Sequence, residues 1–295
     1  MRYALVSFLL IICLATAFSA FGYPKLSQAQ NNKILIDQEE AKLDRETEKT
    51  TNSKVVQKKI TNVIEHYPEY KEGDTLIDEF NGSDLNPNFW NKSEREKNYN
   101  NELQAYVPEN VFLENGFLVL KASKEDSKYK SGLVDTKSKV EFLYCTVEVR
   151  LKYPQGKSFF PAVWMLPSND RSFPETDIFE VVGHHPETVY FVHHYMENGE
   201  KKKTCESTEI VDYLDFHTYK FEWTPYELIW FLDGEIVHRT KKNIYDKPMY
   251  LIMNFAVGGI WPGDPNEDTV FPSNVYIDYV RITPYVPEEK LEGIN

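Results

Sequence analysis

Short, β-prone runs separated by turn signals recur along the chain from about residue 73 to residue 285. The runs alternate apolar and polar residues or are rich in β-branched and aromatic ones, as strands are. No comparably long segment there shows convincing 3.6-residue helical periodicity. About 210 residues of such strands fit one all-β sandwich. The clearest runs are 117–122, 145–151, 188–195, 218–223, 228–238 and 275–282.

Turn signals and composition divide the chain into segments. Asp233-Gly234 is a hairpin signal, because Asp-Gly supplies the positive φ angles of a tight turn. Residues 30–72 are polar, have no aromatic residue before Tyr67 and contain little apolar material to bury, which predicts a spacer. We therefore expect one domain at 73–287, followed by a short polar tail at 288–295.

The first residues predict export. Residues 3–23 carry no charge and follow Arg2, as in a secretory signal peptide. Small residues suit cleavage after Ala17, Ser19 or Ala29, so we assign residues 1–29 to a signal peptide. The uncharged run is also long enough to span a bilayer, so an uncleaved N-terminal anchor is the alternative. Either form predicts a secreted or extracellular protein, membrane-anchored in the second case.

Charge and composition exclude some classes of partner. A net charge of −13 argues against binding to nucleic acid or to an anionic membrane surface. Aromatic residues make up 14% of the chain, and they serve either a β-sandwich core or a ligand-binding cleft. Trp223 and Trp230 lie on alternating runs, so we expect both in the core.

Three acids, Glu175, Asp177 and Glu180, lie in one short apolar run. Side chains alternate along a strand, so Glu175 and Asp177 share a face and a regular strand would send Glu180 to the other. A β-bulge around Ile178-Phe179 would return Glu180 to the same face. Like-charge repulsion makes this cluster costly in a purely structural strand. It suits chemistry in which one carboxylate stays ionised while its neighbour holds a proton.

The acid motif and several other blocks together resemble glycoside hydrolase family 16, in its laminarinase-like branch. The bulged Glu-x-Asp-x-x-Glu spacing is similar to that branch, and the blocks follow the family's order over about residues 73–285. The supporting blocks are Asn100-Asn-Glu-Leu-Gln-Ala-Tyr106, Ser131-Gly-Leu-Val-Asp-Thr-Lys137, Trp164-Met-Leu-Pro, Asn254-Phe-Ala-Val-Gly-Gly, Trp261-Pro-Gly and Asp278-Tyr-Val-Arg281.

The resemblance implies a concanavalin A-like β-jelly-roll of two curved antiparallel sheets with a cleft across the concave face. It also implies that Glu175 is the nucleophile and Glu180 the general acid/base of a retaining hydrolysis, with Asp177 between them. Retention needs two carboxyl groups about 5 to 5.5 Å apart, one to attack and one to protonate the leaving oxygen.

Five further residues are candidates for substrate binding. The C–H face of a sugar ring packs on an indole, which points to Trp164 and Trp261. By resemblance, Asn100 and Glu102 match a sugar-contacting segment. His194 matches a histidine on the strand after the catalytic one, which contacts an acid or the substrate.

Metal binding is predicted at one position only. His193 and His194 are adjacent and would face opposite sides of a strand, which argues against a site that uses both. Members of the family often hold a structural calcium, with a carboxylate that matches Asp278. Oxygen ligands suit Ca²⁺, so the resemblance implies a structural Ca²⁺ there. Catalysis by carboxyl groups needs no cofactor.

The sequence thus predicts an exported, monomeric, endo-acting β-glycosidase whose partner is a polysaccharide, β-1,3 or mixed β-1,3/1,4 glucan. Three alternatives stay open: the same mechanism on a galactan or an exopolysaccharide, transfer of the sugar to another glycan, and carbohydrate binding without catalysis. Phe160, Phe173-Pro174 and Thr176 stand where many laminarinases carry other residues. Because of these departures, the identity of the sugar in the substrate stays open.

Overall fold

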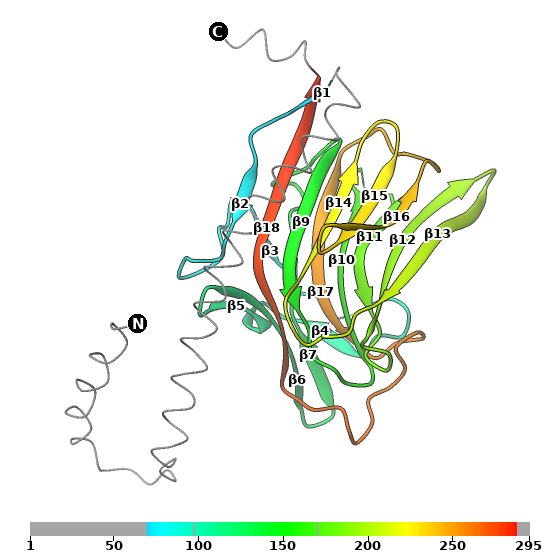
Figure 1. The fold of residues 1–295 in the computed structure, drawn as a ribbon. Helices are drawn as coiled ribbons and strands as arrows, with labels where there is room; N and C mark the ends of the chain where they lie inside the picture. The colour runs from blue at the N-terminus through cyan, green and yellow to red at the C-terminus, as the bar shows by residue number, and fades with distance from the viewer. Residues whose placement is uncertain (1–69, 97, 170, 288–295) are drawn as a thin grey trace, which may run out of the picture. The chain divides into compact units, whose positions relative to one another are not determined.

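Two β-sheets pack face to face in the part of the chain that the computed structural model describes, residues 70–96, 98–169 and 171–287 (Figure 1). These residues belong to one compact unit that spans 61–295. The predicted segment 1–29, the tail 288–295 and the spacer, apart from Tyr70–Glu72, lie outside the described residues. In the described part, no helix is long and apolar enough to cross a membrane.

One sheet has seven strands and ends at β13, as Figure 1 also shows. All its neighbouring strands are antiparallel. In spatial order the strands are β13 (Glu200–Glu209), β12 (Thr188–Glu197), β11 (Glu175–Val181), β10 (Phe159–Pro167), β17 (Met249–Val257), β8 (Leu133–Asp135) and β3 (Asn91–Lys92).

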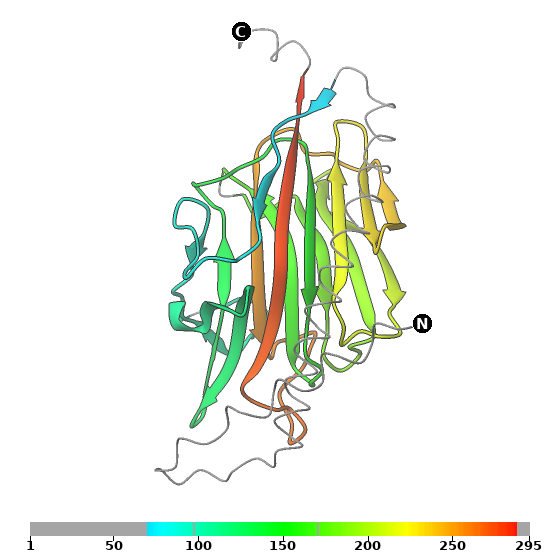
Figure 2. The same cartoon turned by 60° about the vertical axis from the view of Figure 1, so that its left-hand side comes forward.

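The other sheet has eleven strands and is organised around the long strand β18, which Figure 2 shows along its whole length. Its main path is β16 (Glu235–Thr240), β15 (Leu228–Leu232), β14 (His217–Trp223), β9 (Cys145–Lys152), β18 (Ser273–Pro287), β6 (Phe117–Glu125), β7 (Lys128–Ser131) and β4 (Gln104–Tyr106). Off this path, β1 (Tyr70–Glu72) and β2 (Leu76–Asp78) pair with β18, and β5 (Val111–Glu114) pairs with β6 after a 3-10 turn at Pro108–Asn110.

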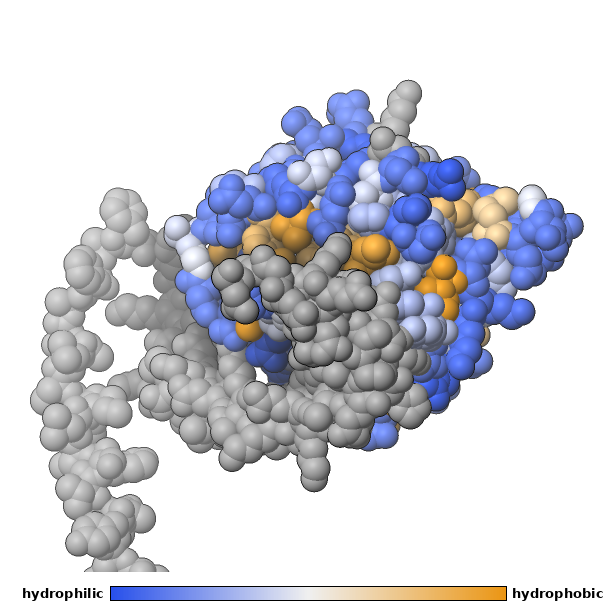
Figure 3. Space-filling model, turned by 90° about the horizontal axis from the view of Figure 1, so that it is seen from above, coloured by the Kyte–Doolittle hydropathy of each residue, from blue (hydrophilic) through white to orange (hydrophobic). Residues whose placement is uncertain are grey.

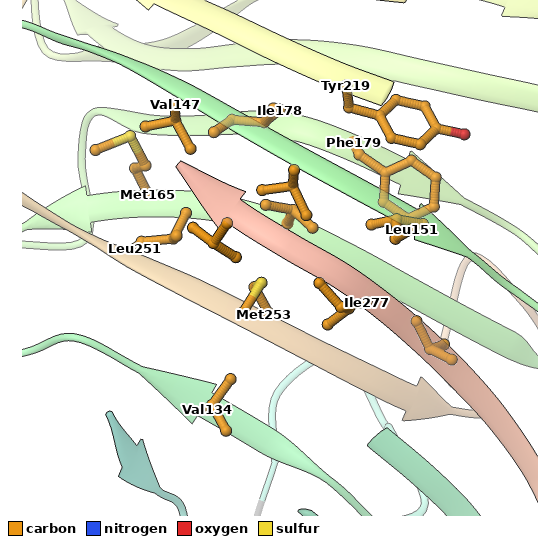
Figure 4. Packing of buried hydrophobic residues seen from close by; sticks show 14 of the residues in the cluster. Val134, Val147, Leu151, Met165, Ile178, Phe179, Tyr219, Leu251, Met253 and Ile277 are labelled. Carbon is orange, nitrogen blue, oxygen red and sulfur yellow. The ribbon is translucent and has the colours of Figure 1, made fainter. Parts of the chain in front are cut away.

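The core lies between the sheets and takes alternate residues from long strands such as β10 and β17. On β10, Phe159, Val163 and Met165 join the core cluster, whereas Phe160 and Trp164 do not. Figure 4 shows the centre of this cluster, to which Val147 and Leu151 of β9, Ile277 of β18, and Leu251 and Met253 of β17 contribute. The face of the seven-stranded sheet that points away from the core is therefore free to carry polar side chains.

The hairpin predicted at Asp233-Gly234 is confirmed. Leu232 pairs with Glu235, and both turn residues have positive φ, 48° for Asp233 and 84° for Gly234. Trp223 and Trp230 are fully buried, as predicted for the core.

The all-β jelly-roll expected from the sequence is confirmed. The two sheets are antiparallel throughout except for the parallel pair β4 and β7. Outside the core, the visible surface is mostly hydrophilic, with apolar side chains exposed in small patches (Figure 3), which agrees with the large net charge.

Candidate active site

The predicted β-bulge is present in β11 and brings the three acids to one face. Asp177 pairs with Val192 and Glu180 with Tyr190, so three steps along β11 match two along β12. The extra residue sends both Ile178 and Phe179 into the core, where Figure 4 shows them, and returns Glu180 to the side of the other two acids. We call this side, which carries Glu175, Asp177, Glu180, Trp164 and His194, the site face.

The opposite sheet holds the bulge from the core side. The indole N–H of Trp230, on β15, donates to the backbone carbonyl of Asp177 at 2.9 Å. A bulge removes a residue from the ladder, and a buried carbonyl without a partner is costly. Trp230 is fully buried, so its hydrogen bond fixes the position of Asp177 relative to the core.

The acids combine burial with mutual repulsion. Asp177 is only 3% exposed, and its Oδ2 atom has no hydrogen-bond partner among the described residues. Burial, together with the charges of Glu180 and Glu175, raises the pKa of Asp177 well above its usual range. Burial and the charge of Glu175 raise the pKa of Glu180 to about 8. Burial raises the pKa of Glu175 to about 7, against the opposing effect of Lys201.

His194 lies beside these acids, as expected, and His193 does not. The Nε2 atom of His194 is 3.7 Å from Oδ2 of Asp177 and 3.9 Å from Oε1 of Glu175. Burial and the nearby lysines 203 and 201 lower the pKa of His194. His193 points into the core side and contacts Thr176. The alternation predicted for the two histidines is thus observed.

Trp164 is held in place beside the acids. It pairs with Asp177 across β10 and β11, and its indole N–H donates to Oδ1 of Asn254 at 2.8 Å. The Asn254 amide in turn donates to the hydroxyl of Tyr106 at 3.0 Å. The indole is partly exposed, so one position next to Asp177 presents an oriented aromatic ring.

Asn100 and Glu102 lie against the loop that follows β17. The backbone carbonyl of Asn100 accepts a hydrogen bond from the N–H of Ile260 at 2.8 Å, and the Asn100 side chain is exposed. Glu102 accepts a hydrogen bond from the amide of Gln104 at 2.8 Å, and burial raises its pKa. A Cβ on Gly259 would lie 3.2 Å from the Asn100 carbonyl oxygen, so the close approach of the two loops favours glycine there.

Trp261 is 43% exposed and stands over two aromatic residues of the sheet. Its ring meets those of Tyr190 and Phe160 edge to face, with centroids 4.9 and 5.4 Å apart. Tyr190 pairs with Glu180 across β11 and β12. Trp261 therefore belongs to the surroundings of Glu180, where an exposed indole is available for stacking.

Asp278 lies far from this constellation in the other sheet. It is buried at a register shift in β18, and its Oδ2 accepts a hydrogen bond from Arg150 at 2.8 Å. A guanidinium already neutralises this carboxylate, which fits poorly with a calcium ligand. Among the described residues, the one group of three that could hold a metal ion is Glu175, Asp177 and His194, whose ligand atoms lie within 4.8 Å of one another.

Sequence reasoning missed the partners of Trp164 and two lysines at the sheet edge. Lys203 pairs with His194, and Lys201 with Met196. The signal for the lysines is Asn198-Gly199, a two-residue hairpin turn with positive φ at both residues. It fixes the register of β12 and β13. No comparable local signal links Trp164 to Asn254, because the two residues are 90 positions apart.

Comparisons with known proteins agree with this geometry. The family model described as glycosyl hydrolases family 16 matches residues 90–281. The beta-glucanase of Rhodothermus marinus is 33% identical over 216 aligned residues, which cover 63% of this chain and 76% of that protein. The laminarinase catalytic domain from Thermotoga maritima MSB8 has a TM-score of 0.65 at 33% identity and covers 73% of this chain and 98% of that one. The endo-beta-1,3-glucanase from Pyrococcus furiosus has a TM-score of 0.66 at 32% identity, and the match covers 74% of this chain and 95% of that one.

Proposed function

The chain belongs to glycosyl hydrolases family 16, and we propose that it is an exported, endo-acting, retaining β-glycosidase that hydrolyses β-1,3 or mixed β-1,3/1,4 glucan. As a member of that family it is a hydrolase of O-glycosyl bonds. The observation that carries the proposal is the bulge in β11, which turns Glu175, Asp177 and Glu180 to one face. The glucan as substrate is supported by the names of the similar proteins, a beta-glucanase, a laminarinase and an endo-beta-1,3-glucanase.

In this proposal Glu180 protonates the leaving oxygen while Glu175 attacks the anomeric carbon. The raised pKa of Glu180, about 8, keeps its proton available near neutral pH. Burial is the larger cause of the raised pKa of Glu180, and formation of the glycosyl ester removes the smaller one, the charge of Glu175. Glu180 then accepts a proton from water more readily, and the ester is hydrolysed with net retention.

Asp177 and Lys201 are proposed to set the charge of the nucleophile. The acids titrate together, so the site holds fewer than three negative charges near neutral pH. The strongly raised pKa of Asp177 assigns one proton to it, which leaves Glu175 as the acid assisted by the Lys201 ammonium. Glu175 is also the more exposed, with 32% of its side chain accessible against 4% for Asp177, so it is the acid that a sugar reaches.

The proposal is tested by the new reducing ends that the protein releases from laminarin, barley mixed-linkage glucan, agarose and carrageenan. We expect release from one of the glucans, and we expect Glu175→Gln to lower it by at least about a thousandfold without loss of folding, since the change removes the nucleophile at almost constant volume. NMR of the first product should show the β-anomer. Turnover of the variant within a few-fold of wild type, or an α-anomer, would overturn the mechanism, and longer products would indicate transfer to another glycan.

A further inference from the structure

Two lysines lie on the site face of the edge strand β13, next to the acids. Glu175 pairs with His194, and His194 pairs with Lys203, so the three residues form one row across β11, β12 and β13. Neighbouring strands are about 4.8 Å apart, which puts the Lys203 backbone roughly 10 Å from that of Glu175. Lys201 pairs with Met196 and lies two residues further along the same face.

The two ammonium groups act on the site face rather than on an acid of their own strand. Both lysines are exposed. Lys203 opposes the rise in pKa of Asp177 and Glu180, and Lys201 opposes that of Glu175. Among the described residues, neither lysine has a carboxylate within 4.0 Å, and Lys201 lies over the ring of Phe173 at 4.8 Å.

The surroundings leave these cations available to a ligand. Their neighbours on the site face of β12 are Met196, His194 and Val192, none of which carries a negative charge. Lys202, between the two, pairs instead with Tyr195, a buried residue whose ring stacks on that of His193 on the core side. Lys202 forms an ion pair with Glu200 at 2.6 Å. Two of three consecutive lysines thus face the acids without a paired carboxylate, in a chain with a net charge of −13.

We propose that Lys201 and Lys203 bind an acidic substituent, a carboxylate, sulfate or phosphate, on a sugar unit that lies beside the nucleophile. The inference rests on the proposed function and narrows its substrate to an acidic β-glycan. A glycan that crosses the strands at Glu175 has the ring of Trp164 on the β10 side and two ammonium groups on the β13 side. The indole ring suits the apolar face of a neutral sugar, and the two ammonium groups suit an anion.

The competing explanation is that the two lysines only shift the pKa values of the acids. The ratio of kcat/KM for a charged substrate to kcat/KM for a neutral substrate distinguishes binding of an anion from that effect. The test uses the full chain with carboxymethyl curdlan and hydroxyethyl curdlan of equal substitution, with sulfated curdlan as a third arm and laminarin as the unsubstituted reference. Any effect of a lysine on the acids changes kcat/KM for charged and neutral substrates alike and cancels in their ratio. Recognition of an anion changes the ratio.

We expect wild type to favour a charged polymer at low ionic strength, and the arm that it favours distinguishes a carboxylate from a sulfate. In the double variant Lys201→Gln/Lys203→Gln, the charged-to-neutral ratio should fall about three- to tenfold, the range of two exposed ion pairs. High salt should do the same to wild type, and Lys202→Gln should leave the ratio unchanged.

Equal losses on charged and neutral polymers in the double variant, or no preference in wild type, would overturn the inference while the proposed function stands. If wild type releases no reducing ends from laminarin, from barley mixed-linkage glucan or from any of the three derivatives, the proposed function fails, and the inference with it.

Discussion

His193 and His194 are adjacent in the sequence and have opposite roles. His194 lies among the acids, whereas His193 lies on the core side. The Nε2–H of its neutral ring donates to the carbonyl of Asn243 at 3.4 Å, and its Nδ1 accepts from the hydroxyl of Thr176 at 3.0 Å. Burial lowers the pKa of His193 to about 4, and His194 and His238 add to the effect. Thr176, which departs from the family's pattern, thus gives the buried imidazole a partner directly behind Glu175 and Asp177.

His193 should make the folded state less stable in mild acid. Its pKa is about 4 in the folded protein and about 6.5 in the unfolded chain. Between these two pH values the unfolded chain therefore binds a proton at His193 that the folded protein does not bind. The contribution is fully present above pH 6.5 and is lost as pH falls towards 4, by up to about 3 kcal/mol. We expect His193→Gln to lose this part of the pH dependence of urea unfolding between pH 4 and 7. Parallel wild-type and variant curves would contradict the assignment.

At the residue scale, the positions of the three acids could be predicted from the sequence, but the residues that surround them could not. The spacing of Glu175, Asp177 and Glu180 shows that a bulge would bring the three acids to one face, because alternation along a strand is local, and the neighbouring blocks that resemble the family made this spacing specific. Asp278 shows where prediction from the local sequence ends. Its partner Arg150 is 128 positions away, so the ion pair between them could not be predicted from the local sequence, whereas the calcium ligand expected at Asp278 came from the family resemblance and stays a prediction.

At the scale of elements, β11 depends on a strand of the other sheet. The bulge follows Asp177, and Trp230 of β15 donates a hydrogen bond to the Asp177 carbonyl from the core side at 2.9 Å. Trp223 of β14 is equally buried, and its indole N–H donates to the carbonyl of Tyr245 at 3.1 Å. The two tryptophans therefore offer a matched pair, one bonded to the acid strand and one to a loop.

We expect Trp230→Phe and Trp223→Phe to destabilise the protein by similar amounts, about 2–4 kcal/mol, because each loses a buried hydrogen bond and ring volume. Only Trp230→Phe should also lower kcat, by about tenfold or more, since a small displacement of the acids is costly for catalysis. Urea unfolding and kcat, measured well below the unfolding temperature of both variants, check this. An equal fall of kcat in both would mean that the bond to Asp177 has no special part in positioning the acids.

Strands with a strong apolar pattern were predictable, and an exposed one was not. The predicted run 145–151 became β9 and 218–223 became β14, each within one residue, because half or more of their side chains are buried. The strand β13 reads Glu-Lys-Lys-Lys-Thr-Cys-Glu-Ser-Thr-Glu and is almost wholly exposed, so no hydrophobic alternation marks it. It is a strand because it pairs with β12, and the only local sequence signal for that pairing is the hairpin turn at Asn198-Gly199.

At the scale of the whole molecule, the folded unit starts no later than residue 70. The backbone of β1 pairs with the end of β18, Tyr70 with Pro287 and Glu72 with Tyr285. A chain that begins at Gly73 would lose this pairing, so activity measurements are better made with the polar segment retained. Cleavage at any of the predicted export sites, none later than Ala29, leaves β1 intact.

Export should therefore yield an active protein whose N-terminus identifies the processing. The uncharged residues 3–23 are proposed to direct the chain across a membrane. Expressed with its own N-terminus, the protein should appear outside the cells. A mature chain that begins after Ala17, Ser19 or Ala29 would identify a signal peptide, and an intact chain in the membrane fraction an anchor. Glucanase activity and uncleaved chain confined to the soluble cell interior would contradict export, because an apolar run that neither inserts nor is removed does not act as a targeting segment.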